Sequence, residues 1–365
     1  MTIRRHVTCW LVALSMTLAP ACVRAEIDST PLAALQFALS SAAGHAPGRV
    51  GIAVEDLATG MTSGVNASAS LPAASTIKIP VMVEVFKQME AGALNLTRVV
   101  HLEASDRDWG WGDMADARPG TSKTIKQLLW LMITQSDNTA TNMLIRVVGR
   151  QHINATMRGL GLRSTRLGDS IRSETETIRY ALRTSPRDMV ALLDKIARDK
   201  LVDEWSSREM LTILTGQTHN GLLPVPLPKD IKIAHKTGSL HDTLNDVGIV
   251  YRDDEPYVIA VMTTELPDLG LGRAFIHKVS RIAFDEFSRF ATWREDQGIA
   301  AFSAAHPSEA VAEPLTPDEV MWNSARPAVP APAIEPEQEA APQPDVQPVS
   351  EPSSAPDLSN GSPSR

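Results

Sequence analysis

The chain has 365 residues, of which 43% are hydrophobic, and a formal net charge of −8. The segment from Ser303 onward holds ten acidic and two basic residues, which accounts for the whole of this charge. The rest of the chain is balanced, so electrostatics give no reason to expect nucleic acid or an anionic membrane surface as a partner. Both cysteines, Cys9 and Cys22, lie within the first 25 residues. The remaining chain therefore has no thiol for catalysis, disulfides or metal binding.

The first 25 residues have the pattern of a secretory signal peptide. Two arginines precede an uncharged apolar run over 7–21, and residues 23–25 (Val-Arg-Ala) offer a cleavage site. The run is shorter than the roughly 18 to 20 residues that cross a bilayer. We therefore expect an exported protein, periplasmic or secreted, that is cut after residue 25. Lipidation of Cys22 is less favoured, because residues 19–21 match a lipobox poorly.

Strand patterns lie towards both ends of the chain, and helical patterns dominate between them. The strand patterns cover 49–55, 61–65, 231–235, 247–251 and 257–263. The helical patterns include Pro31–Ala43, 125–133, Pro186–Ala197 and 272–290. This order predicts an α+β fold, with an antiparallel sheet built from both chain ends and flanked by helices. An all-helical lobe over about 75–214 completes it, and a small ligand is expected between sheet and lobe.

The segment 303–365 differs in composition from the rest. It holds thirteen of the twenty-five prolines, with Ala, Glu, Ser and Gln filling most of the remainder. Such a stretch buries too little apolar surface to offset its ordering entropy, which predicts a disordered acidic tail. The chain thus divides into a signal peptide over 1–25, a folded domain over 26–302 and a tail over 303–365. We expect a monomer, and nothing in the tail identifies a partner for it.

Three short motifs follow one another along the chain. Residues 75–78 (Ser-Thr-Ile-Lys) place Ser75 and Lys78 one turn apart on one helix face. A serine hydroxyl needs a base to become nucleophilic, and a lysine in a dry cleft near other cations has a lowered pKa. Residues 136–138 read Ser-Asp-Asn, and 236–239 read Lys-Thr-Gly-Ser at the end of a predicted strand. By chance, a chain of this length is expected to contain about one match to the first motif but only about 0.05 to 0.1 matches to each of the others.

The ordered set S-x-x-K, S-D-N, K-T-G is typical of class A β-lactamases and penicillin-binding proteins. Residues 28–291 resemble a class A β-lactamase domain in motif order, spacing and layout, and 184–189 resemble the segment that follows the family's Ω-loop. The resemblance implies that Ser75 attacks the carbonyl of a β-lactam or acyl-D-alanyl peptide. Lys78 would help to remove its proton, and Ser136 would pass a proton to the departing nitrogen.

The resemblance also implies a substrate-binding set that comprises Asn138, Lys236, Thr237, Gly238, Ser239 and Trp111. Asn138 would hold the amide of the substrate side chain, and the Lys-Thr-Gly-Ser motif would bind the substrate carboxylate. Trp111 falls where the family often has an aromatic residue lining the cleft. The backbone N–H groups of Ser75 and Ser239 would form the oxyanion hole. No cofactor and no metal are implied.

A β-lactamase must also hydrolyse its acyl-enzyme, and class A enzymes use an Ω-loop glutamate for this step. Residues 172–174 (Arg-Ser-Glu) match the family's Arg-x-Glu, and Glu174 lies 36 residues after Asn138. Glu174 is the expected base, with Glu176 as the alternative. The sequence departs from the family pattern at Ile178, Ala181, Leu182 and Asn245. Asn245 stands where the family has an arginine near the carboxylate pocket, and Arg273 is the candidate to substitute for that arginine.

The leading interpretation is a serine β-lactamase that works through an acyl-serine. One alternative is a D,D-peptidase-like or penicillin-binding relative that deacylates slowly, and another is a non-catalytic β-lactam or muropeptide sensor. A metallo-hydrolase is disfavoured because the nine histidines show neither H-x-H nor H-E-x-x-H spacing. A Ser-His-Asp hydrolase is disfavoured because the sequence has no G-x-S-x-G motif.

Overall fold

The structure, a computed structural model, describes residues 31–172, 178–252, 255–296, 298 and 311–316. The signal-peptide prediction, Glu174, Glu176 and most of the predicted tail lie outside these residues. Within them, no helix is both long enough and apolar enough to cross a membrane.

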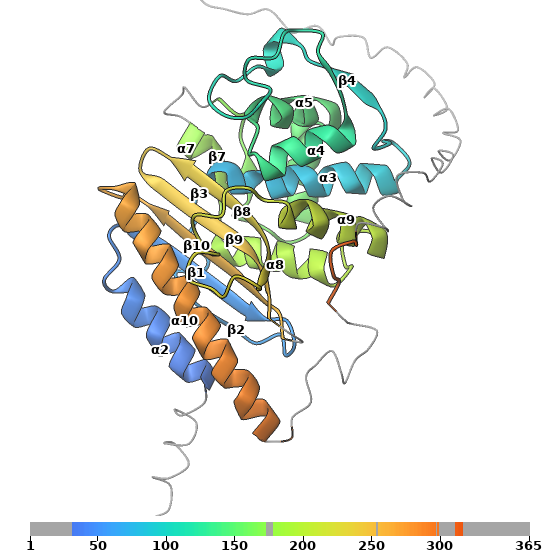
Figure 1. Ribbon diagram of the computed structural model, residues 1–365. Helices are drawn as coiled ribbons and strands as arrows, with labels where there is room; N and C mark the ends of the chain where they lie inside the picture. The colour runs from blue at the N-terminus through green and yellow to red at the C-terminus, as the bar shows by residue number, and fades with distance from the viewer. Residues whose placement is uncertain (1–30, 173–177, 253–254, 297, 299–310, 317–365) are drawn as a thin grey trace, which may run out of the picture. The chain divides into compact units, whose positions relative to one another are not determined.

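A five-stranded antiparallel sheet forms one side of the domain (Figure 1), as the sequence predicts. Its strands run in the order β2-β1-β10-β9-β8. They span Arg49–Asp56 (β1), Thr62–Val65 (β2), Lys232–Leu240 (β8), Thr243–Tyr251 (β9) and Tyr257–Thr264 (β10). The first strand pairs with the last over eight residues, from Arg49 opposite Thr264 to Asp56 opposite Tyr257. The two ends of the domain are therefore joined in the centre of the sheet.

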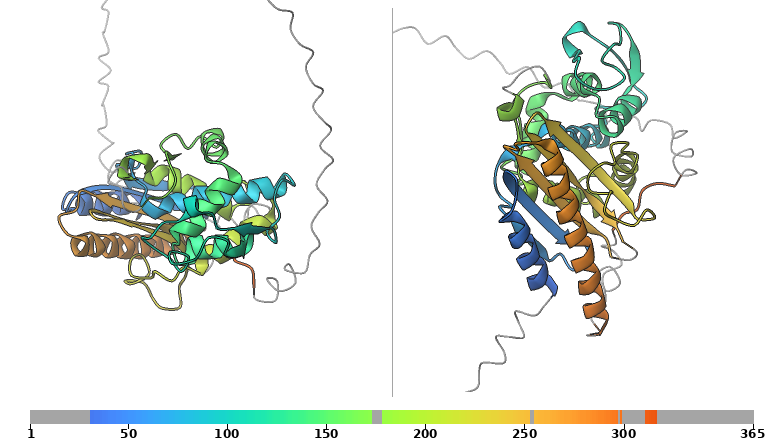
Figure 2. Two further views of the ribbon diagram at one scale, coloured as in Figure 1. Left: turned by 90° about the horizontal axis from the view of Figure 1, so that it is seen from above. Right: turned by 60° about the vertical axis from the view of Figure 1, so that its left-hand side comes forward.

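Helices cover both faces of this sheet, which is why every residue of β9 and β10 is buried instead of alternating between buried and exposed. Helices α2 (Pro31–Ala43) and α10 (Leu269–Asp296) lie side by side on one face (Figure 2). Helix α8 (Pro186–Ala197) packs on the other face, against β1, β9 and β10. Successive strand residues point to opposite faces, so Ile52 joins the core under α2 and α10 while Ala53 joins the core of the helical lobe.

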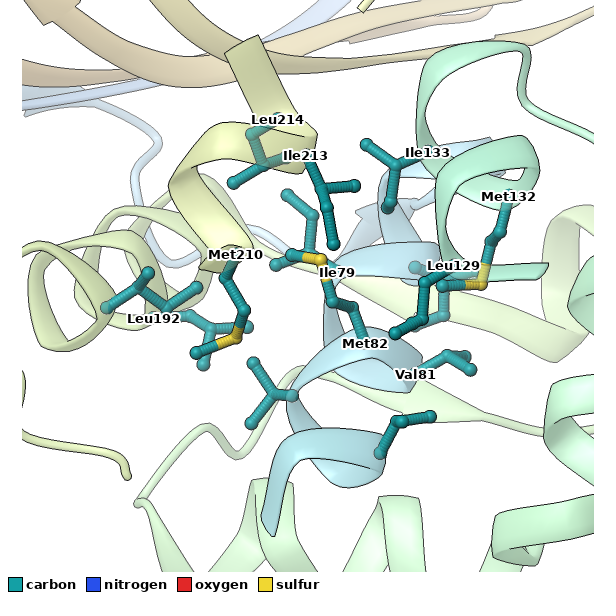
Figure 3. Close-up of a cluster of buried hydrophobic side chains, with 14 of the residues drawn as sticks. Ile79, Val81, Met82, Leu129, Met132, Ile133, Leu192, Met210, Ile213 and Leu214 are labelled. Carbon is teal, nitrogen blue, oxygen red and sulfur yellow. The ribbon is translucent and has the colours of Figure 1, made fainter. Parts of the chain in front are cut away.

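The helical lobe surrounds α3 (Lys78–Glu90), whose residues from Lys78 to Phe86 are all buried. A helix that is buried on every side belongs at the centre of a lobe. Figure 3 shows its apolar side chains, among them Ile79 and Met82, packed against those of the surrounding helices. The other helices of the lobe are α4 (Ile125–Thr134), α5 (Asn138–Val148), α6 (Arg150–Gly159), α7 (Ile178–Ala181) and α9 (Glu204–Thr215), with 3-10 turns η1 (Ala74–Ile77) and η2 (Ala104–Asp106).

The lobe also contains short strands that the sequence reading of this region as helical did not include. One pair joins β4 (Val99–His101) to β5 (Ser122–Thr124). A three-stranded sheet has the order β3-β7-β6, over Leu71–Pro72, Leu182–Thr184 and Arg166–Leu167 respectively. The strand β3 lies directly before η1 and α3, so this small sheet supports the first of the three motifs.

Candidate active site

Ser75 lies in η1, in a segment that is fixed from two directions. The backbone N–H of Ala73 donates to Leu182 O at 2.9 Å, which ties the segment to β7. The buried side chain of Asn245, on β9, donates through Nδ2 to Pro72 O at 2.9 Å and to Ala73 O at 3.2 Å. Asn245 Oδ1 in turn accepts from the backbone N–H of Thr263 at 3.0 Å. Asn245, which stands where the family has an arginine, therefore anchors the nucleophile segment to the main sheet.

Lys78, the first residue of α3, is completely buried. Its Nζ donates to Ser136 O at 2.6 Å, to Asn138 Oδ1 at 2.7 Å and to Ser136 Oγ at 3.2 Å. Burial, and next the positive charge of Lys236, hold the pKa of Lys78 well below its usual range. A lowered pKa makes the neutral amine, which can accept a proton, easier to reach than in an exposed lysine.

Ser136 connects two lysines. It lies in the turn before α5 with φ at +59°, in the left-handed region that non-glycine residues rarely occupy. Its Oγ accepts from Lys78 Nζ and also from Lys236 Nζ, the latter at 3.0 Å. Lys236 is completely buried, and burial lowers its pKa to about 7. One residue from each of the three motifs, Lys78, Ser136 and Lys236, thus meets around one hydroxyl, which lies between two amines of lowered pKa.

The start of α5 is joined to the loop that carries Trp111. Asp137 caps α5 by accepting from Ala140 N, and its second carboxylate oxygen accepts from Met114 N at 2.7 Å. Asn138 N donates to Trp111 O at 3.0 Å. The Trp111 ring remains 55% exposed and lies 5.8 Å from the ring of His219, centroid to centroid. Trp111 is therefore an exposed aromatic beside the S-D-N motif, and its part in lining a cleft remains a prediction.

The Asn138 side chain is held at both ends within the protein. Its Oδ1 accepts from Lys78, and its Nδ2 donates to Asp108 Oδ1 at 2.8 Å. A carbonyl-type oxygen has a second lone pair. One lone pair of Oδ1 and the second N–H of Nδ2 therefore remain for the predicted contact with a substrate amide.

The K-T-G motif lies within β8, which continues to Leu240 instead of ending near residue 235. A Cβ placed on Gly238 would lie 3.0 Å from Ala73 O, Ala74 Cβ and Ser75 N. Glycine therefore permits the strand to approach the nucleophile segment this closely. Thr237 is half-buried and Ser239 is exposed on this part of the strand. This proximity of β8 to Ser75 N is the arrangement that the predicted oxyanion hole needs.

Sequence reasoning missed a buried polar cluster directly behind Lys236. His235 Nδ1 lies 2.9 Å from Asp246 Oδ1, and His235 Nε2 lies 2.9 Å from Asn220 Oδ1. Both ring nitrogens of His235 therefore face oxygen atoms of polar side chains. Asp246 Oδ2 also accepts from Leu223 N at 3.0 Å. The signal was the position of His235 beside the motif, but pairing it with Asp246 requires the β8–β9 register.

The described parts of the predicted Ω-loop fix both of its ends. Gly168 N donates to Ala181 O at 2.7 Å, which closes the loop at its neck. Asn142, on α5, exchanges two hydrogen bonds with the backbone of Ile171, at 2.8 and 3.0 Å. Arg172 donates to the backbone oxygens of Ser105 and Arg107 at 2.9 and 3.0 Å. The neck continues into β7, which is bonded to β3 and to Ala73, so the loop leaves and returns beside the nucleophile segment.

This fold, with Ser75, Lys78, Ser136 and Lys236 gathered between sheet and helical lobe, is that of the penicillin-recognising hydrolases. A statistical model of the Beta-lactamase enzyme family matches residues 34–287, and the chain belongs to that family. It is 28% identical over 246 residues to a beta-lactamase of Streptomyces lavendulae, a match that covers 64% of this chain and 80% of the relative.

Two solved structures are also similar to this chain. The crystal structure of a beta-lactamase from Sphaerobacter thermophilus matches at 30% identity with a TM-score of 0.64, covering 69% of this chain and 96% of the other. A mutant of PBP-A in an acyl-enzyme complex with penicillin G matches at 29% identity with a TM-score of 0.65, covering 70% and 96% respectively. The family confirms the predicted resemblance and a hydrolase function in general terms. The roles of the individual site residues remain predictions.

Proposed function

We propose that the protein is a serine β-lactamase that hydrolyses β-lactam antibiotics through an acyl-enzyme on Ser75. The observation that carries this proposal is the position of Ser136 Oγ between Lys78 and Lys236. Lys78 in turn follows Ser75 by about one helical turn. In acylation, Ser75 Oγ forms a bond to the β-lactam carbonyl carbon and its proton leaves towards neutral Lys78. The C–N bond then breaks, and the nitrogen receives a proton through Ser136.

The hydrogen bonds of Lys78 support this proton route. A charged Lys78 uses its three N–H groups on Ser136 O, Ser136 Oγ and Asn138 Oδ1. A neutral Lys78 has only two N–H groups and one lone pair. If the two shortest hydrogen bonds stay on Ser136 O and Asn138 Oδ1, the lone pair is available to the Ser75 or Ser136 hydroxyl. The lowering of the Lys78 pKa by burial favours this neutral state.

Lys236 is suited to the substrate carboxylate. It is buried beside Ser136, and its pKa of about 7 means that it gains a full charge when an anion enters. Thr237, Gly238 and Ser239 follow on the same strand and complete the proposed carboxylate site. The backbone N–H groups of Ser75 and Ser239 are proposed to stabilise the oxyanion.

Deacylation is the step that separates this function from its nearest alternative. We propose that Glu174, or else Glu176, activates the hydrolytic water, because the neck of their loop lies beside Ala73. A penicillin-binding protein with slow deacylation is the second candidate. The match to the PBP-A acyl-enzyme with penicillin G favours it, together with the departures of this loop from the class A pattern.

The deciding experiment is a time course of the protein from residue 26 onward with nitrocefin, followed by intact-mass measurement. Many turnovers with little adduct are expected of a β-lactamase. One equivalent of product with a persistent adduct identifies the penicillin-binding alternative, and the same adduct with no hydrolysis of acyl-D-alanyl peptides leaves only a sensor. Ser75→Ala should abolish the adduct, and a remaining adduct would overturn the nucleophile assignment. Glu174→Gln should trap the acyl-enzyme, with Glu176→Gln as the matched variant.

We also propose export to the periplasm or the medium, since β-lactams and peptidoglycan peptides are met outside the cytoplasm. The pattern of residues 1–25 supports it. The mass of the protein recovered from the periplasm or medium should correspond to a start at Glu26. A lipid-modified mass starting at Cys22 would instead identify a lipoprotein.

A further inference from the structure

A short part of the predicted tail is packed on the domain. Residues 311–316 lie beside α9, where Ala312 and Leu315 are buried (Figure 1). Ala312 N donates to Ala197 O at 2.6 Å, at the end of α8, and Ala312 O accepts from Tyr251 Oη at 3.3 Å. The composition that predicts disorder over 303–365 gave no sign of these contacts. They fix the place from which the rest of the tail departs.

The segment runs along α9 towards the C-terminal end of that helix. Glu313 O accepts from Arg208 Nε at 3.0 Å, and Leu315 N donates to Thr212 Oγ1 at 2.7 Å. Arg208 and Thr212 are one helical turn apart, so the tail advances by one turn of α9 between Glu313 and Leu315. The following turn of α9 holds Ile213 and ends at Gly216.

At that turn, the surface between α4 and α9 is hollowed into an open apolar groove of about 350 Å³. The groove is lined by Lys123, Lys126, Gln127, Trp130, Leu131 and Ile213. Trp130 is 44% exposed, although its ring is held against the end of α9, since a Cβ on Gly216 would lie 2.6 Å from it. A large aromatic surface exposed in a hollow marks a binding site more often than a single exposed apolar residue does.

The residues that follow Thr316 match this groove in hydrophobicity and in charge. Residues 318–322 read Asp-Glu-Val-Met-Trp, and Val320 to Trp322 are the only three consecutive large apolar residues after Thr316. The two acidic residues complement Lys123 at the rim, where Lys126 Nζ is already paired with Glu209 Oε1 at 2.9 Å. Trp322 is the sixth residue after Thr316, and six residue steps span up to about 20 Å when the chain is extended. That exceeds the roughly 8 to 10 Å between packed helices.

We propose that residues 318–322 occupy the α4–α9 groove of their own chain. Val320, Met321 and Trp322 cover Trp130, Leu131 and Ile213, while the acidic pair lies at the lysine rim. The tail is then anchored as far as Trp322. The proposal is independent of the reaction at Ser75.

Disulfide trapping tests this placement, because the chain from residue 26 onward has no cysteine. Gln127→Cys, on the exposed part of the groove, is combined with Met321→Cys in the chain that runs from residue 26 to 365. Disulfides form only when the two Cα atoms lie within about 7 Å. The matched control combines Gln127→Cys with Val349→Cys, which lies in the same tail but outside the proposed segment.

On mild oxidation, the 127–321 pair should form an intramolecular disulfide at least ten-fold faster than the 127–349 pair, read as loss of free thiol by intact mass. Equal rates for the two pairs would overturn the proposal. Disulfide-linked dimers in place of monomers would also overturn it and would assign the groove to a second copy. Hydrogen exchange on the unmodified chain checks the result without any variant. Residues 318–322 should exchange at least ten-fold more slowly than 345–349, and equal exchange contradicts the docking.

Discussion

Gly238→Ala tests whether the close approach of β8 to Ser75 sets the rate of acylation. The added Cβ would lie 3.0 Å from Ala73 O, Ala74 Cβ and Ser75 N at once. Favourable contacts between carbon atoms begin near about 3.5 Å. The strand and the nucleophile segment must therefore separate by about 0.5 Å. Both sides are held by backbone hydrogen bonds, so the separation cannot be absorbed by a flexible side chain.

This separation falls on the backbone N–H groups of Ser75 and Ser239, the proposed oxyanion hole. Loss of one oxyanion donor costs about 10²- to 10³-fold in rate. A misplacement of about 1 Å costs up to about 10²-fold. Half of that displacement predicts acylation about ten-fold slower than in the wild type. The overpacking should also lower the free energy of unfolding by about 1 to 3 kcal/mol.

The assay is the single-turnover rate of nitrocefin acylation with protein in excess, at a temperature where both proteins are fully folded by circular dichroism. Urea unfolding measures the stability separately. Gly159→Ala is the matched control, because a Cβ at this position of α6 meets no neighbouring atom within 4 Å. If Gly238→Ala acylates as fast as wild type and as the Gly159→Ala control, the proposed role of this contact is refuted.

Three further predictions concern buried charges. Lys236 has a pKa of about 7 and is charged below that pH, so the second-order rate constant of acylation should fall as pH rises through about 7. Lys236→Arg should move this fall to higher pH. An unshifted pH profile would assign the fall to another group. Asp246→Asn replaces the carboxylate that faces His235 Nδ1 and accepts from Leu223 N, and it should lower the free energy of unfolding by about 1 to 3 kcal/mol in urea. An unchanged free energy of unfolding would contradict a stabilising role for these contacts. Burial, and next the charge of Asp194, raise the pKa of Glu55 from 4.5 to about 7, so folding favours its protonated form. The resulting stabilisation is complete below pH 4.5 and is lost as pH rises to about 7. Glu55→Gln should flatten the decline of the urea midpoint over this pH range. An unchanged decline would show that Glu55 does not cause it.

The sequence predicted those parts of the fold in which local pattern and tertiary structure agree. The helices Pro31–Ala43 and Pro186–Ala197 have the predicted bounds, because Pro186 sits at the first turn of its helix and Ser185 caps it. The predicted strand over 231–235 proved longer, since β8 runs on through Gly238 to Leu240. Glycine weakens a strand pattern in the sequence, whereas here it permits close packing against η1.

Contacts between distant segments were the part that the sequence could not supply. Pairing His235 with Asp246 depends on a strand register that a shift by one residue would undo. Asn245 appeared only as a departure from the family pattern, and its bonds to Pro72 and Ala73 span more than 170 residues of chain. The docking of 311–316 uses mostly backbone atoms, which any residue offers, so composition carried no trace of it.

The site also concentrates backbone strain at the residues that its chemistry uses. Ala74, directly before the nucleophile, has φ at +48°, and Ser136 has φ at +59°. For residues other than glycine, each such conformation costs about 1 to 2 kcal/mol. The strain is sustained by bonds on either side of it, from Asn245 to Ala73 and from Lys78 to the carbonyl oxygen of Ser136 itself. The buried lysine therefore has a structural role besides its proposed role as a base, because it fixes the turn that brings the Ser136 hydroxyl between two amines.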